Sequence, residues 1–176
     1  MDQTETLKTI LENPLIAKIT FDCRADSDAL YHQFQVKLEG CLDLQVFNQG
    51  IERERKTYKA TDYQGRPTFV RGCKVLASSY CSSSIVSAYT VSAPHKSDYN
   101  IWKKRPLSNE QWSYAAFDVL LINAMYDEMK TLVTPEMLER IKIGSKRYEN
   151  VFRDYPYDVN ANFQRHKKFI MTEVPI

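Results

Sequence analysis

The stretch 105–119 constrains the fold more than any other part of this 176-residue chain. Ser108 and Gln111 have the spacing of a capping box, in which each side chain accepts a hydrogen bond from the other residue's backbone N–H. Pro106 lies just before the cap, where a proline does not interrupt the helix. Apolar residues then recur at helical spacing, so the sequence predicts a helix over residues 108–131. The apolar positions are Trp112, Ala115, Ala116, Val119, Leu120, Ile122 and Met125.

The same helix carries Tyr114 and Asp118, which are four residues apart and therefore share one face. A phenol beside a carboxylate suits chemistry on a metal-bound water and a phosphodiester. The alternative interpretation is an ordinary amphipathic helix with an exposed acid, and this stretch alone favours neither.

A second stretch predicts a strand over residues 16–22 that runs into a helix over residues 26–35. Asp26 is placed at the turn between them, at the carboxyl end of the strand, where ligands and metals bind in α/β sheets. A further short strand is expected over residues 41–47, with Asp43 at its start.

In this order the motifs resemble the 3′–5′ exonuclease domain of the DnaQ-like, ribonuclease-H-like superfamily, of the DEDDy type. They are most similar to the RNase D and Egalitarian branch. The resemblance covers about residues 5–130 and implies an α/β, ribonuclease-H-like fold. The motifs are Asp-Cys-Arg-Ala-Asp-Ser-Asp-Ala-Leu, then Leu-Asp-Leu-Gln-Val, then Arg-Pro-Leu-Ser with Tyr-Ala-Ala-Phe-Asp-Val.

The resemblance also implies a site and an activity. Asp26 and Asp118 would bind Mg²⁺ or Mn²⁺, and Tyr114 would orient the attacking water. Asp43 would support the site structurally. The implied reaction is metal-dependent hydrolysis of the 3′ end of single-stranded RNA or DNA.

Basic residues beside aromatic ones suit a single-stranded backbone with stacked bases. We predict nucleic-acid contacts at Arg24 and at the run Lys103, Lys104 and Arg105, which follows Trp102. The alternative is a solvated, charged surface, since the net charge is only +2.

The family's first acidic motif, an Asp-x-Glu pair on an early strand, does not occur in this sequence. The implied fold therefore lacks its first strands. Three explanations stay open: a fragment of a longer exonuclease, an inactive relative that binds RNA or a protein, or a sheet completed by another chain. The third explanation predicts a dimer or a protein partner.

Residues 1–153 are expected to form the exonuclease-like domain, and residues 154–176 an extended tail. Thr134 and Pro135 have the pattern of a cap and a first helical residue, so a helix is expected to run from there to Arg153. Between the main motifs, residues 51–66 are expected to form a solvated helix or loop, residues 68–80 a short helix or strand, and residues 81–96 a loop.

Composition limits the remaining classes of function. No apolar run reaches the ~20 residues of a membrane span, and no Gly-rich phosphate-binding motif is present. The four cysteines have no Cys-x-x-Cys spacing. We interpret them as reduced core thiols, which is typical of an intracellular protein of the cytoplasm or nucleus.

Overall fold

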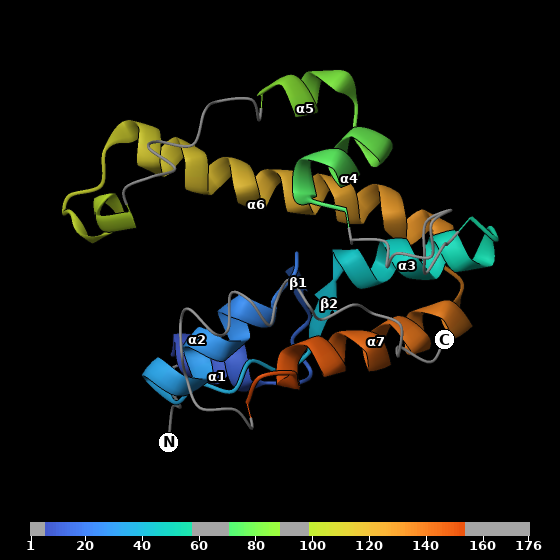
Figure 1. Cartoon of the computed structure of the whole chain (residues 1–176), viewed down its shortest axis with the longest axis horizontal. Helices are drawn as coiled ribbons and strands as arrows, with labels where there is room; N and C mark the ends of the chain where they lie inside the picture. Colours follow the sequence, from blue (N-terminus) through green and yellow to red (C-terminus); the bar gives the residue numbers. More distant parts are fainter. Residues whose placement is uncertain (1–5, 58–70, 89–98, 154–176) are drawn as a thin grey trace, which may run out of the picture. The chain divides into compact units, whose positions relative to one another are not determined.

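The structure, a computed structural model, describes residues 6–57, 71–88 and 99–153. The expectations for residues 58–66, 68–70, 89–96 and 154–176 fall outside these residues. The chain divides into two compact units, Met1–Arg71 with Leu132–Ile176 and Gly72–Thr131 (Figure 1). None of the helices in the described ranges is long and apolar enough to cross a membrane.

The first unit contains a small parallel sheet with helices. Strands β1 and β2 pair in parallel, with Lys18 beside Cys41 and Thr20 beside Asp43. The expected strand over residues 16–22 is thus present in its central part. In chain order the elements are α1 (Leu7–Glu12), β1 (Lys18–Thr20), α2 (Arg24–Phe34), β2 (Cys41–Asp43), α3 (Leu44–Glu54) and α7 (Pro135–Asn150).

The strand expected over residues 41–47 is wrong beyond its third residue. β2 ends at Asp43, and residues 44–54 form α3. The Asp43 carboxylate accepts a hydrogen bond from the backbone N–H of Gln45 at 2.9 Å, which caps the new helix. Residues 44–51 are all buried, polar ones included, so the alternation of apolar and polar residues that suggested a strand does not mark one buried face here.

The turn between β1 and α2 also differs from the expectation. α2 begins at Arg24, so Asp26 lies in the first turn of the helix and not in the connecting turn. Asp22 occupies that turn with a φ of 55°. Aspartate is one of the few side chains that adopts this left-handed conformation at low cost.

Helix α7 starts as predicted. The Thr134 side chain accepts a hydrogen bond from the Met137 backbone N–H at 3.2 Å, and Pro135 is the first helical residue. The helix ends at Asn150, three residues before the expected end. In Figure 1 it runs alongside β2, and it also packs on α2 and α3.

The outer edge of β2 is closed by side chains of α7. Ser145 Oγ accepts a hydrogen bond from the Asp43 N–H at 3.0 Å, and Glu149 Oε1 accepts one from the Cys41 N–H at 2.6 Å. Both N–H groups are buried and point away from β1, whose Lys18 N–H bonds to Gly40 O. Unpaired N–H groups there would be costly, so α7 is an integral part of this unit.

The second unit is helical. Its elements are α4 (Cys73–Tyr80), α5 (Ser83–Ala88), the 3-10 turn η1 (Tyr99–Lys103) and α6 (Asn109–Met129), which is followed by a second 3-10 turn, η2 (Lys130–Leu132). Helix α4 packs against α6 and α5. The loop expected over residues 81–96 is wrong where α5 forms. For residues 68–80, expected to form a helix or a strand, the described part contains the helix α4. Buried Leu76, Ala77, Leu121, Met125 and Met129 form the apolar core of the unit.

The capping box at the start of α6 is confirmed. Ser108 Oγ accepts from the Gln111 N–H at 3.3 Å, and Gln111 Oε1 accepts from the Ser108 N–H at 2.7 Å. The local sequence thus sets the start of the helix that carries Tyr114 and Asp118.

Candidate functional site

The acidic turn of the first unit, residues 21–26, joins the end of β1 to the first turn of α2 and carries Asp22 and Asp26. It is organised by an ion pair between Asp22 and Arg24. Arg24 Nη2 donates to Asp22 Oδ2 at 2.8 Å, and Arg24 Nε donates to the other carboxylate oxygen. The guanidinium is buried and lies 4.7 Å from the centroid of the Tyr148 ring. Burial lowers the pKa of Arg24, but the Asp22 carboxylate together with the charges of Tyr148 and Asp43 raises the pKa on balance. Arg24, predicted to contact nucleic acid, is thus held by Asp22 and Tyr148.

Asp26 follows on the first turn of α2, with its side chain exposed. Partial desolvation by surrounding protein atoms and the negative charge of Asp22 raise the pKa of Asp26. A bound cation would offset both effects, because each disfavours an isolated negative charge.

Asp43 is fully buried beneath this turn. One carboxylate oxygen accepts from the Cys23 N–H at 2.8 Å and from Thr20 Oγ1 at 3.2 Å, while the other caps α3 at Gln45. Burial raises the pKa of Asp43 to about 6, although these backbone hydrogen bonds oppose the rise. The side chain connects the end of β1, the start of α2 and the start of α3, and so holds the backbone that carries Asp26.

Helix α7 also bonds to the first turn of α2. Ser27 Oγ, next to Asp26 in the chain, donates to the Glu149 carbonyl at 2.6 Å. Sequence patterns did not indicate this role of α7 beforehand. The feature that could have indicated this role is a set of polar residues at helical spacing on the apolar face of α7. These residues are Ser145, Tyr148 and Glu149, and they share the face with Met137 and Ile141.

In the second unit, Tyr114 and Asp118 lie on α6, both partly exposed. The Tyr114 ring contacts Trp102 of η1, with 6.0 Å between ring centroids and a tilt of 46°. The Cys73 thiol has its pKa raised to about 11 by burial and by the charge of Asp118, which places that carboxylate near the start of α4.

The basic run of the second unit lies directly after Trp102. Lys103, Lys104 and Arg105 are exposed, and no carboxylate in the described part of the chain forms an ion pair with them. Arg105 Nη1 donates to the carbonyls of Trp102 at 2.7 Å and Lys104 at 2.8 Å, so its guanidinium is oriented by the backbone.

The carboxylates of Asp26 and Asp118 are suitable ligands for a divalent ion, because Mg²⁺ and Mn²⁺ favour hard oxygen ligands. Asp26 belongs to the first unit and Asp118 to the second. Within residues 6–57, 71–88 and 99–153 there is no group of three or more His, Cys, Asp or Glu side chains that could hold a metal ion. The described residues therefore supply two candidate ligands and not a complete ligand set.

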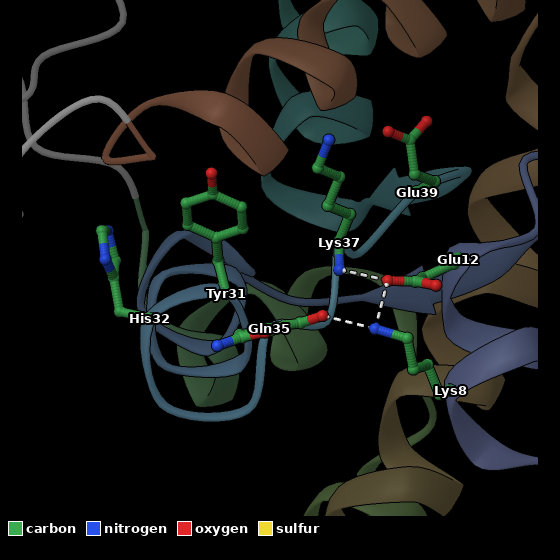
Figure 2. A pocket seen from close by; sticks show the side chains of 7 residues that line it. All are labelled: Lys8, Glu12, Tyr31, His32, Gln35, Lys37 and Glu39. Carbon is green, nitrogen blue, oxygen red and sulfur yellow. Dashed lines mark hydrogen bonds and ion pairs between the residues drawn. The ribbon is translucent and has the colours of Figure 1, made fainter.

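An open pocket of about 720 Å³ lies elsewhere on the first unit, and none of the predicted site residues lines it (Figure 2). Glu12 accepts from the Lys37 N–H at 3.0 Å and pairs with Lys8 Nζ at 3.1 Å. Figure 2 shows the Lys8 ammonium turned toward the Glu12 carboxylate, while the Lys37 side chain points away from it. Its lining consists of Lys8, Glu12, Tyr31, His32, Gln35, Lys37 and Glu39.

Comparison with protein families gives a match over most of the chain. The model of the 3′–5′ exonuclease family matches residues 1–134. The chain belongs to the 3′–5′ exonuclease family. The predicted family is therefore confirmed, and the match ends where α7 begins.

Two solved structures of RNase D from Trypanosoma brucei resemble this exonuclease family member. The complex with RNA U12 has a TM-score of 0.60, with 24% identity over 91% of this chain and 54% of the RNase D chain. RNase D alone has a TM-score of 0.58, with 24% identity over 91% of this chain and 56% of the other. These likenesses confirm the predicted ribonuclease-H-like exonuclease fold.

The chain is also similar to the piRNA biogenesis protein EXD1 of Bombyx mori. The two are 46% identical over 50 residues, which are 28% of this chain and 16% of that protein. The chain thus spans about half the length of the RNase D chains and a smaller share of EXD1.

Proposed function

We propose that this exonuclease family member takes part in divalent-metal-dependent hydrolysis at the 3′ end of single-stranded nucleic acid. Membership of the 3′–5′ exonuclease family is the observation that carries the proposal. The positions of Tyr114 and Asp118 on one helix, and of Asp26 on a turn braced by Asp43, support it.

Under this proposal Asp26 and Asp118 hold Mg²⁺ or Mn²⁺. When bound, such ions stabilise the charge on the attacking and leaving oxygens of a phosphodiester. Tyr114 orients the water that attacks the phosphorus, and Asp43 keeps the first turn of α2 in place. The products are nucleoside monophosphates released one at a time.

We infer that the substrate is RNA. The similar RNase D was solved in complex with RNA U12, and EXD1 is named for piRNA biogenesis. Exposed Lys103, Lys104 and Arg105 supply positive charge for phosphate contacts. RNA as the substrate is consistent with a protein of the cytoplasm or nucleus.

A second candidate is binding of RNA or a protein without hydrolysis. The observation that favours it is the absence of an Asp-x-Glu pair from the 176 residues. Two carboxylates leave the bridging positions of a two-metal site unfilled. A second copy of this chain, or a partner chain, could complete the sheet and supply the remaining carboxylates. A dimer is therefore part of the proposal.

The test is the shortening of 5′-labelled single-stranded RNA and DNA by the purified chain with Mg²⁺ or Mn²⁺. We expect loss from the 3′ end, and Asp118→Asn should slow it by about 100-fold or more, because several kcal/mol of charge stabilisation is removed. Asp127→Asn is the matched control, since Asp127 lies on the same helix and is exposed. Binding without shortening would establish the second candidate, and unchanged activity in Asp118→Asn would contradict the assigned site.

A further inference from the structure

We propose that Trp102 stacks on a nucleobase of the bound strand beside Tyr114. This rests on the proposed function in one respect, namely that a nucleic-acid strand approaches α6. The inference concerns the indole of η1, which has no role in the proposed hydrolysis.

The indole has the exposure and the neighbour that such a role needs. Trp102 keeps 38% of its surface exposed, and its ring centroid lies 6.0 Å from that of Tyr114. The two rings are tilted by 46° and not stacked face to face. A base on the open part of the indole would therefore lie next to the phenol that we assign to the attacking water.

Gln111 ties the backbone of η1, next to this indole, to the start of α6. Its Nε2 donates to the Ile101 carbonyl at 2.8 Å, while its Oε1 accepts from the Ser108 N–H at 2.7 Å. Gln111 is buried, and its bond to the Ile101 carbonyl is shielded from water. One side chain thus ties η1 to the start of the helix that carries Tyr114. A surface fixed before binding loses less conformational freedom when the ligand arrives.

The charge around the indole suits a polyanion. Lys103, Lys104 and Arg105 follow it directly, and within the described ranges none of them is paired with a carboxylate. An aromatic ring flanked by cations is the usual arrangement for single strands, in which the bases stack and the phosphates bind the cations. The class of ligand is therefore single-stranded nucleic acid with accessible bases.

The chain provides a matched control in Trp112. Trp112 is more exposed, at 62%, and lies near the start of the same helix. Residues 112 and 114 are two positions apart on α6 and so point to different faces. Since these are the two tryptophans of the chain, the fluorescence of each can be read separately.

The experiment uses single-tryptophan chains that also carry Asp118→Asn, so that Mg²⁺ can be present without hydrolysis. Trp112→Phe leaves Trp102 as the fluorophore, and Trp102→Phe leaves Trp112. Each protein is titrated with oligoadenylate RNA. We expect saturable quenching of Trp102 emission and no change in Trp112 emission. Quenching of Trp112 alone, or of neither, would overturn the inference.

Affinity gives a second readout. Trp102→Ala should weaken oligonucleotide binding about 5- to 100-fold, as expected for the loss of one stacked base, while Trp102→Phe should lose less. Trp112→Ala should bind like the parent chain, and circular dichroism confirms folding of each variant. If Trp102→Ala does not fold, the fluorescence titration with Trp112→Phe still decides. Equal affinity in a folded Trp102→Ala would contradict the proposal.

The two proposals fail in different ways. A chain that shortens RNA while Trp102 emission stays constant refutes the stacking and keeps the hydrolysis. A chain whose Trp102 is quenched but that never shortens RNA confirms the stacking and refutes the hydrolysis.

Discussion

The buried carboxylate of Asp43 accepts a hydrogen bond from the backbone N–H of Cys23 at 2.8 Å, across 20 residues of sequence. Its second oxygen accepts from the Gln45 N–H at 2.9 Å. One side chain therefore links the end of β2 to the starts of α2 and α3. The geometry of the turn that carries Asp26 depends on this carboxylate.

Replacing Asp43 with alanine should destabilise the first unit. The change removes a helix cap, worth about 1 kcal/mol, and leaves the buried Cys23 N–H without its acceptor, at about 1–3 kcal/mol. We expect a loss of about 2–4 kcal/mol in the free energy of unfolding, measured by urea titration. Asp127→Ala, at an exposed carboxylate of α6, is the control and should change little. Equal stability of both variants would contradict the role of Asp43.

Asp43 should also make stability depend on pH. Its pKa in the folded chain is about 6, above the ordinary value, so the folded state holds the proton to a higher pH than the unfolded state does. The contribution of Asp43 to the free energy of unfolding is therefore complete below about pH 4 and falls as pH rises toward 6. The expected fall is about 3 kcal/mol, because a tenfold difference in acidity between the folded and unfolded states corresponds to about 1.4 kcal/mol.

Unfolding titrations of the wild type and Asp43→Asn at several pH values measure this contribution as a difference. Other titrating groups cancel in the comparison. We expect the advantage of the wild type over the variant to shrink between about pH 4 and pH 6. Parallel curves for the two proteins would show that Asp43 is not the titrating group.

Ser145→Ala should weaken the closure of β2 by α7. The buried Asp43 N–H would lose its acceptor, which costs about 1–3 kcal/mol. Hydrogen exchange of the Asp43 amide should accelerate, while the Cys41 amide, bonded to Glu149, should change less. Lys142→Ala, at an exposed position of the same helix, serves as the control and should leave both amides unchanged.

A chain ending at residue 134 provides a broader test of α7. It retains the whole stretch that matches the exonuclease family but loses every acceptor from α7. We expect this shortened chain to show no cooperative unfolding of the first unit by circular dichroism, because buried N–H groups of β2 would be unpaired. A cooperative transition like that of the full chain would contradict the integral role of α7.

Local signals explain which helices the sequence predicts correctly. The starts of α6 and α7 follow from the capping residues Ser108, Gln111 and Thr134, whose partners lie three residues away. Such contacts depend only on the neighbouring sequence, so pattern reading finds them.

The errors have equally specific causes. The strand expected through Phe47 fails although the sequence from Leu42 to Val46 alternates apolar and polar residues as a strand does. The polar positions are buried as well, and the Asp43 side chain caps a helix at this point. The role of α7 rests on contacts between residues far apart in sequence, such as Ser27 with Glu149 at a separation of 122. The bracing of the acidic turn is thus a property of tertiary packing, which a single sequence does not display.

The proposed hydrolysis requires both Asp26 and Asp118. The most direct measurement is the rate of 3′-end shortening of single-stranded RNA by Asp26→Asn, Asp118→Asn and the double variant. Residues that act as one unit show strongly non-additive losses. We predict that each single variant loses nearly as much activity as the double variant. Losses that multiply, or a single variant that keeps full activity, would contradict the proposed joint role of Asp26 and Asp118.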